Sequence, residues 1–194
     1  MLLKFDIPSR LINDPGFSKV LELKLQWNQA LLANWLYDDL NKWTWWLNLA
    51  GVIIPIIILW KLIDRARFLQ ILVFGFLIAM LSTFLDEIGM AFSLWEYPDR
   101  LLPISPRLFP IDFVALPFFY MLVYQYYHDG RGFIVANVIL AAFLAFVLEP
   151  ILVWLNLYLV TNWQHHYSFI IYILIAVVSR WLTNILVDQD SNYK

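Results

Sequence analysis

Four acidic residues stand inside or at the edges of long apolar runs in this sequence. Asp86 and Glu87 lie near the end of one run, Asp112 begins the next, and Glu149 lies near the end of a later one. A carboxylate beside hydrocarbon is costly, so each of these groups needs a partner or a function. Carboxylate oxygens suit hard divalent cations, and two neighbouring carboxylates can act as general acid and base. These four residues are therefore the first candidates for ligand binding.

Histidines further along the chain could widen the range of metals. A site formed by Asp86, Glu149 and either His165 or His166 would accept zinc-like ions as well as hard cations. Adjacent histidines diverge, so at most one of the two is expected to join such a site. A histidine at the membrane interface with its own partner is the simpler interpretation. The sequence therefore leaves the metal and any cofactor unknown.

Aromatic residues complete the set of candidate ligand contacts. Trp95 follows the run that carries Asp86, while Tyr120 and Tyr124 share one side of the run that Asp112 begins. A tyrosine stripe of this kind more often packs against other helices than encloses a ligand. Packing is therefore the favoured role for the two tyrosines.

The competing interpretation of the acids is structural. Each could pair with Arg100, Arg107 or a tyrosine hydroxyl and only orient the helices. Helix capping is the favoured role for Asp112, which stands where a helix is expected to begin. For Asp86 and Glu149 a functional pocket and structural pairing both stay open, because acids within a membrane are functional candidates by default.

The composition indicates a membrane protein. Of the 194 residues 62% are hydrophobic and only 14% are charged, whereas a typical globular domain is about half apolar and a quarter charged. The mean hydropathy is +0.68. A net charge of −2 gives no electrostatic footprint for nucleic acid. Because the chain has no cysteine, disulfides, thiolate metal sites and a cysteine nucleophile are excluded.

Five apolar runs are long enough to cross the hydrocarbon core as helices, which takes about 20 residues. They cover residues 45–62, 68–92, 111–127, 133–152 and 167–187. Before them, residues 17–40 carry apolar residues at helical spacing and predict an amphipathic helix at the membrane interface. The sequence thus predicts an all-α polytopic membrane protein with five transmembrane helices and an N-terminal interfacial amphipathic helix. Its parts are the lead-in with this helix (1–43), the transmembrane bundle (44–187) and a polar tail (188–194).

Tryptophans mark the ends of the apolar runs. Those at or near an end are Trp43, Trp45, Trp46, Trp60, Trp95, Trp154, Trp163 and Trp181. Such positions suit an aromatic belt at the level of the lipid headgroups. The amphipathic helix carries two more tryptophans that suit the same level, Trp27 and Trp35.

Stripes of small residues orient two of the predicted helices. One stripe contains Gly75, Ala79, Ser82, Asp86, Gly89 and Ser93, and the other contains Ala141, Ala142, Ala145 and Glu149. Small residues at this spacing allow helices to approach closely in lipid. Both acids should therefore face the inside of the bundle.

Alternating crossings bring the acids to one membrane face. The second predicted helix ends and the third begins on this face, and the fourth ends and the fifth begins there too. The loops of this face carry Glu96 and Asp99, which are expected to be solvated. The opposite face receives Lys61, Arg65, Arg67, Arg131 and Arg180. By the positive-inside tendency the acidic face lies outside, with the N-terminus outside and the C-terminus in the cytoplasm.

Glu149 precedes a proline within an apolar run. The residue before a proline is pushed away from helical geometry, and Pro150 would clash with the carbonyl of Phe146 in a regular helix. We therefore expect a local break in the helix beside this carboxylate. Such breaks at membrane depth are tolerated where they are buried in protein or line a cavity.

Several motifs occur in an order that resembles a known family. They are LDEIGMAFSLWEYPDRLLP, IDFVALPFFYMLVYQYY, FVLEPILVWLNLY and NWQHHYSFIIYILI. Over about residues 45–185 the chain resembles an uncharacterised family of small multi-pass membrane proteins of endospore-forming Firmicutes. The resemblance implies a bacterial plasma membrane and carries neither a reaction nor a ligand. A looser likeness to carotenoid-type membrane cyclases rests on Glu-Pro and Trp-rich helix ends, and no catalytic role is carried over from it.

Three functions remain open. In the first, the inward acids and aromatic residues form a pocket at one membrane face that binds an ion or small ligand, or they support membrane assembly. In the second, the protein is an intramembrane enzyme acting on a lipid or isoprenoid, with Asp86 and Glu149 as acid and base. In the third, it is the substrate-capturing subunit of a vitamin-type transporter. The expected partners are the lipid bilayer, a small-molecule, lipid or ion ligand, and a second copy or another membrane protein, with no nucleic acid.

Overall fold

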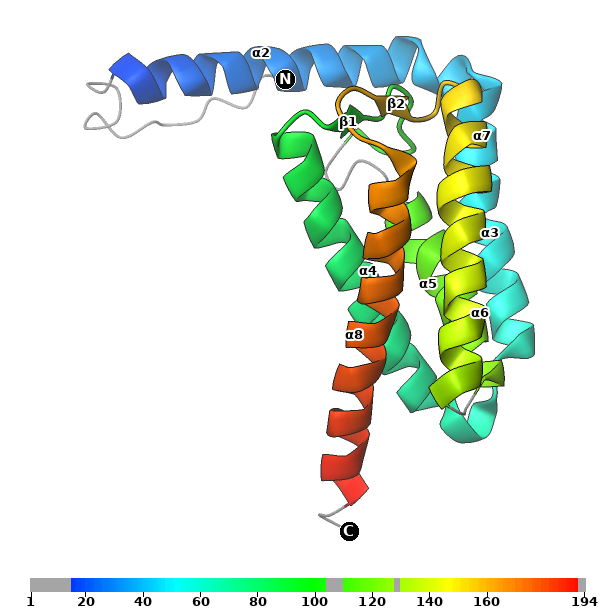
Figure 1. Cartoon of the computed structure of the whole chain (residues 1–194). Coiled ribbons are helices and arrows are strands. Elements are labelled where there is room, and N and C mark those ends of the chain that lie inside the picture. The colour runs from blue at the N-terminus through cyan, green and yellow to red at the C-terminus, as the bar shows by residue number, and fades with distance from the viewer. Residues whose placement is uncertain (1–14, 104–109, 128–129, 192–194) are drawn as a thin grey trace.

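The computed structural model of the chain describes residues 15–103, 110–127 and 130–191. These residues form a bundle of upright helices with helix α2 (Pro15–Tyr37) lying across one end (Figure 1). The stretches that are long and apolar enough to span a membrane are Trp43–Leu62, Arg65–Ala91, Gly130–Trp154 and His165–Val187. An all-helical protein with several spanning helices, as the composition predicts, is thereby confirmed.

The first two spanning helices form a hairpin. A short turn, η1 (Asp39–Asn41), connects α2 to α3 (Trp43–Leu62), which runs away from α2. A second turn, η2 (Arg65–Arg67), leads into α4 (Phe68–Ala91), which returns to the end where α2 lies (Figure 1). The sequence predicts both spanning helices to within a few residues.

The third predicted helix is irregular. After strand β1 (Trp95–Glu96) the chain re-enters the bundle as the π-helical segment η3 (Pro110–Ala115), followed by α5 (Leu116–Tyr126). Pro117 lies in the first turn of α5, where the missing backbone N–H costs no helical hydrogen bond. This stretch is shorter than the four spanning helices, so a fifth crossing is not confirmed by helix length.

The last part of the chain contains one long rod and one long helix. Helix α6 (Gly130–Phe143), the π-helical segment η4 (Leu144–Leu148) and α7 (Glu149–Trp154) follow one another without a gap. Strand β2 (Leu159–Val160) then pairs antiparallel with β1, and α8 (His165–Ser191) runs back through the bundle (Figure 1). The polar tail predicted at 188–194 is therefore helical as far as Ser191, and its last three residues lie outside the described residues.

The predicted helix break at Glu149 is wrong. Glu149 keeps helical backbone angles (φ −56°, ψ −48°), and its N–H donates to the carbonyl of Leu144, five residues earlier. This longer bond belongs to the π-helical turn, which widens the helix just before Pro150. This extra residue in the turn accommodates the proline, so the helix continues from α6 into α7. The extra residue also changes which side chains face the inside of the bundle after the turn.

The inward stripes are confirmed except for Ser93 and for Ala142, which is half-buried. Gly75, Ala79, Ser82, Asp86 and Gly89 of α4 are all buried, and so are Ala141, Ala145 and Glu149 of the rod. Ser93 is exposed, because it follows the end of α4 and adopts a left-handed backbone angle (φ 53°). Close packing along these stripes holds α4 and the rod against their neighbours.

The core explains the tyrosine stripe. Tyr120 and Tyr124 are buried together with Phe74 and Phe133, and the rings of Phe74 and Tyr124 stack with centroids 4.3 Å apart. The Tyr124 hydroxyl accepts a 2.8 Å hydrogen bond from Gln70. Both tyrosines therefore pack in the core, the role that the sequence favours.

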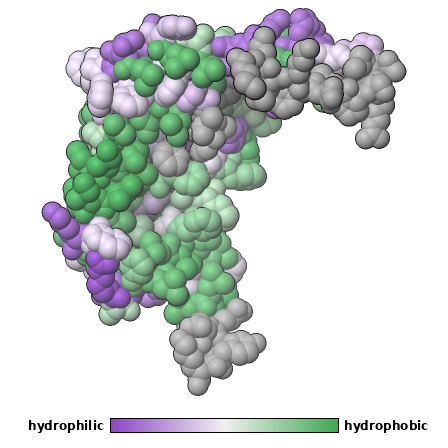
Figure 2. All heavy atoms as spheres, turned by 180° about the vertical axis from the view of Figure 1, so that it is seen from behind, coloured by the Kyte–Doolittle hydropathy of each residue, from purple (hydrophilic) through white to green (hydrophobic). Residues whose placement is uncertain are grey.

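Apolar side chains cover much of the outer surface of the bundle (Figure 2). Exposed examples from all four spanning stretches are Ile54, Phe76, Phe84, Ile139 and Leu174. An exposed apolar surface of this extent marks contact with a membrane or partner. Polar residues gather over α2 and at the opposite end of the bundle (Figure 2), as a spanning bundle requires.

Helix α2 has no buried residue and is fixed to the bundle at its C-terminal end. The indole N–H groups of Trp35 and Trp45 both donate to the carbonyl of Leu101, at 3.0 and 3.1 Å. Asn34 donates to Oδ1 of Asp39 at 2.9 Å. The helix lies across the bundle end (Figure 1), the orientation expected for an interfacial helix.

One loop acid differs from its prediction. Asp99, expected to be solvated, is only 7% exposed. Its carboxylate accepts 2.6 Å hydrogen bonds from the ammonium group of Lys42 and the hydroxyl of Thr44. The acid is buried because it joins the loop after β1 to the start of α3, and its charge is compensated by Lys42.

Candidate ligand-binding cavity

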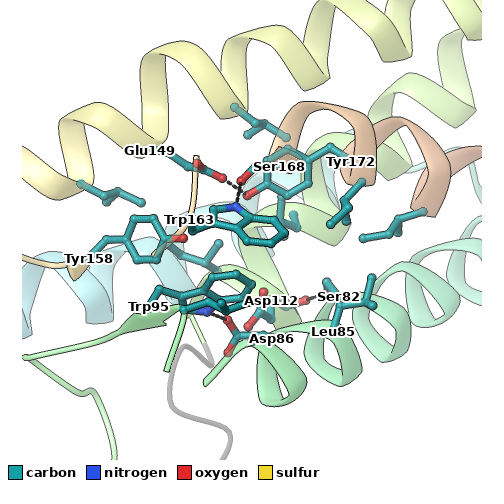
Figure 3. A pocket seen from close by; sticks show the side chains of 18 of the residues that line it. Ser82, Leu85, Asp86, Trp95, Asp112, Glu149, Tyr158, Trp163, Ser168 and Tyr172 are labelled. Atoms are coloured by element: carbon teal, nitrogen blue, oxygen red, sulfur yellow. Dashed lines mark hydrogen bonds between the residues drawn. The ribbon is translucent and has the colours of Figure 1, made fainter. Parts of the chain in front are cut away.

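A cavity of about 290 Å³ lies inside the bundle (Figure 3), near the lower end of the range for small-molecule sites, about 300–1,000 Å³. It is lined by α4, η3, the start of α5, η4, α7, α8 and the segments around β1 and β2. Most of the wall is apolar, with residues such as Leu85, Leu116, Leu148 and Ile175. Its polar residues are Ser82, Asp86, Trp95, Tyr97, Asp112, Glu149, Tyr158, Trp163, Ser168 and Tyr172. A mainly apolar wall with a few convergent polar groups is typical of a binding site.

Asp86 is held by two residues of the connection between α4 and η3. Oδ1 accepts a 2.8 Å hydrogen bond from the indole N–H of Trp95 and a 2.6 Å bond from the hydroxyl of Tyr97. Pairing of Trp95 with Val160 across the two strands positions this connection. The carboxylate is thus oriented by neutral donors that come from outside its own helix.

Glu149 has its own set of partners. Oε1 accepts a 2.8 Å hydrogen bond from the hydroxyl of Tyr172, and Oε2 lies 2.7 Å from Nδ1 of His165. Glu149 is 6% exposed, while the side chain of His165 is 33% exposed. His166 instead packs its ring against Tyr167. Only one histidine therefore joins the polar network, as the sequence predicts.

Asp112 has no described hydrogen-bond partner for one of its carboxylate oxygens. It is 5% exposed, and Oδ2 is buried without a partner among the residues that the structure describes. Its main-chain carbonyl accepts a 3.2 Å bond from Ser82 of α4. The predicted capping role is wrong, because Asp112 lies inside η3, which begins at Pro110. The carboxyl lines the cavity instead.

Four aromatic residues form one side of the cavity, which we call the aromatic wall: Trp95, Tyr97, Tyr158 and Trp163. The rings of Trp95 and Trp163 meet edge to face with centroids 4.9 Å apart, and those of Tyr97 and Tyr158 stack at 5.4 Å. Burial, and then the negative charge of nearby acids, raises the pKa of Tyr97 and of Tyr158. Both hydroxyls therefore remain protonated near neutral pH and can donate.

The expected aromatic belt is correct only in part. Trp43, Trp46, Trp60, Trp154 and Trp181 are exposed on the bundle surface, as a belt requires. Trp95 and Trp163 instead line the cavity, and Trp163 donates a 2.9 Å hydrogen bond to Ser168. These two positions near helix ends place the indoles above the cavity because the β1–β2 pair folds over it.

The structure separates the predicted site residues into two groups. Asp86, Asp112, Glu149 and Trp95 share the cavity, whereas Glu87, Tyr120 and Tyr124 do not line it. Arg107, a predicted partner of the acids, lies outside the described residues. Within the described ranges no group of three or more His, Cys, Asp or Glu could hold a metal ion.

Sequence reasoning missed most of the aromatic wall. Tyr97, Tyr158 and Trp163 lie in short connections without helical periodicity, so no spacing pattern points to the cavity. Tyr172 did carry a signal, because it shares a face of the fifth predicted helix with Ser168, which also lines the cavity. Two residues that are four apart on a helix lie on one face.

The cavity combines the kinds of groups that ligand binding and proton transfer require. Its wall combines three carboxylates, several hydroxyl or indole donors and a large apolar surface. The Glu149–His165 contact connects the buried carboxylate to a partly exposed ring.

Comparison of the chain with family models, with curated proteins and with solved structures finds no match.

Proposed function

We propose that this protein is a multi-pass membrane protein whose cavity binds a small ligand at one membrane face. The observation that carries the proposal is that three carboxylates from three separate segments, α4, η3 and the start of α7, line one cavity. Asp86 and Glu149 each have their own hydrogen-bond partners, as purely structural acids would. Together with Asp112 they also line one space with apolar and aromatic surface, the form that small-molecule sites take.

The membrane arrangement that supports this function has five crossings. In this arrangement η3 and α5 make the third crossing, since they lie among the other helices (Figure 1). Helix α2 rests in the interface at the cavity end, and the acidic face lies outside a bacterial plasma membrane. The basic residues Lys61, Arg65 and Arg131 are near helix ends away from the cavity, which favours a cytoplasmic position for that end.

Native mass spectrometry of the purified full chain tests the cavity as a binding site. Ile171 lines the cavity, whereas its neighbour Ile170 is 53% exposed on the outside of α8. Ile171→Trp should fill the cavity, and Ile170→Trp makes the same change on the lipid side. We expect wild type and Ile170→Trp to carry one co-purified small molecule that Ile171→Trp lacks. A bare wild-type chain, or the same adduct on Ile171→Trp, contradicts the proposal.

Acid–base catalysis on a lipid or isoprenoid is a second candidate. It is favoured by one observation: Asp86 and Glu149 line the same cavity, and Glu149 contacts the partly exposed His165. The two carboxylates lie on different sides of the cavity (Figure 3), so they would act on separate atoms of a substrate. Conversion of a membrane lipid extract by wild type, lost in Glu149→Gln while the adduct is still bound, supports catalysis. Unchanged lipid with wild type removes this candidate.

A further inference from the structure

We propose that the ligand of this cavity is a small organic cation, an amine or quaternary ammonium with apolar substituents, held by Asp112 and faced by the aromatic wall. The inference rests on the proposed function, since it names the class of molecule that the same cavity takes. Charge, hydrogen bonding and ring chemistry each support it.

The charge of the cavity wall is one-sided. Asp86, Asp112 and Glu149 line it, and among the described lining residues there is no lysine, arginine or histidine. A carboxylate in a low-dielectric site is stable only when an opposite charge or a proton compensates it. A cationic ligand would supply this compensation, whereas an anionic ligand would add to the repulsion.

Asp112 marks the place of the cation within the cavity. The residue lines the cavity, and its Oδ2 atom is buried and lacks a hydrogen-bond partner within the described ranges. Buried polar atoms in native proteins nearly always have a partner, so an exception requires an explanation. Glu149, by contrast, has partners for both oxygens, and the carboxylate of Asp86 already accepts two hydrogen bonds on Oδ1. The carboxyl of Asp112 is therefore the group that a bound cation would satisfy.

The aromatic wall selects an organic cation over a hydrated metal ion. Trp95, Tyr97, Tyr158 and Trp163 line the cavity, and ring faces attract a cation within about 6 Å of their centroids. The remaining wall is apolar and would suit methyl or larger substituents around the charge. A metal ion would instead need several oxygen or nitrogen ligands, and no such group of three occurs in the described part of the chain.

Two probes of nearly equal shape test the role of charge. Benzyltrimethylammonium is a cation, and 2,2-dimethyl-1-phenylpropane replaces its nitrogen with carbon and is neutral. Binding is measured by the saturable shift in unfolding temperature of the full chain in detergent. We expect the cation to bind at least about tenfold more tightly than the neutral probe. We expect Ile171→Trp, but not Ile170→Trp, to abolish the shift.

Two carboxyl variants then locate the cation. Asp112→Asn should lower the affinity for the cation by about tenfold or more. It should change the affinity for the neutral probe by no more than about twofold. Glu22→Gln removes the same charge from the exposed surface of α2, at a residue that does not line the cavity, and it should change neither affinity by more than about twofold. Equal loss in both carboxyl variants would contradict the assignment to Asp112.

The remaining outcomes separate this inference from the proposed function. If wild type binds the two probes with equal affinity, the inference that the ligand is a cation is wrong. The cavity then binds small apolar molecules. If wild type binds neither probe, the inference of a cationic ligand is also wrong. The proposed function is then tested only by whether a small molecule co-purifies with the protein. If Asp112→Asn does not fold, two tests of cation binding in the cavity remain. They are the comparison of the two probes on wild type and the comparison of Ile171→Trp with Ile170→Trp.

Discussion

The indole N–H of Trp95 donates a 2.8 Å hydrogen bond to Oδ1 of Asp86. Trp95 belongs to β1, so a short strand outside the helices orients a carboxylate inside the bundle. Gly89 of α4 makes this approach possible, because a Cβ atom at this position would overlap the indole ring. The cavity therefore depends on a close contact between a helix and the loop that follows it.

Replacing Gly89 with alanine should disturb this contact. The rigid indole ring must move to admit a methyl group, and the bond to Asp86 is lost with it. We expect Gly89→Ala to lower the free energy of unfolding by about 1–3 kcal/mol. Gly51→Ala is the matched control, since a Cβ there meets nothing within 4 Å. Equal stability of the two variants in thermal unfolding would contradict the packing described.

Glu149→Gln should destabilise the protein in the same way with and without divalent cations. The substitution removes the charge that His165 and Tyr172 face, and loss of a buried hydrogen bond to a charged group costs about 1–3 kcal/mol. Thermal unfolding in calcium, in magnesium and in chelator measures the loss. A loss confined to the samples with metal would instead identify Glu149 as a metal ligand.

Lys42 gives the protein a pH dependence of known sign. Its hydrogen bond to Asp99 raises the pKa of Lys42 above the ordinary value of 10.5. A group whose pKa is higher in the folded state stabilises the fold below its unfolded pKa, and this contribution disappears as the pH rises through the folded pKa. The side chain is 44% exposed, so screening limits the effect to below about 1 kcal/mol.

The measurement compares wild type with Lys42→Gln across this range. We expect the variant to unfold at a lower temperature near about pH 8 and the difference to shrink above about pH 11. Lys42→Arg keeps the positive charge at high pH. Its unfolding temperature should therefore stay above that of Lys42→Gln there. A constant difference between wild type and Lys42→Gln at all pH values would show that the lysine charge is not responsible.

The orientation in the membrane can be read by thiol labelling, because the chain contains no cysteine. Thr161 is exposed beside β2 at the cavity end, and Ala66 is exposed in η2. In intact cells, an impermeant maleimide should label Thr161→Cys and should reach Ala66→Cys only after permeabilisation. The reverse pattern would place the cavity at the cytoplasmic face, and labelling of both in intact cells would contradict the spanning arrangement.

The sequence predicts the position of the acids better than their surroundings. Helical periodicity places Asp86 and Glu149 on inward stripes, and alternation of crossings brings them to the end where Asp112 begins the next run. These patterns persist over many residues because lipid forces apolar runs to span as helices. The convergence of the three acids on one cavity follows from this regularity.

The parts that could not be predicted have no regular repeat. Strands β1 and β2 have two residues each, too few for an alternation pattern, so the aromatic wall that they position was not foreseen. Burial of Asp99 depends on Lys42 and Thr44, which are more than fifty residues earlier in the chain. The π-helical turn before Pro150 likewise reflects tertiary packing, whereas local rules favour a break.

The most direct test of the cavity as a ligand site is a crystal structure with a bromine-labelled probe. Anomalous scattering from 4-bromobenzyltrimethylammonium locates the bromine without reference to any ligand density. We predict one bromine peak inside the cavity, between α4 and α8 and in contact with the aromatic wall. A peak confined to the apolar groove lined by Pro55, Phe76 and Pro117, or to the surface of α2, would contradict the account.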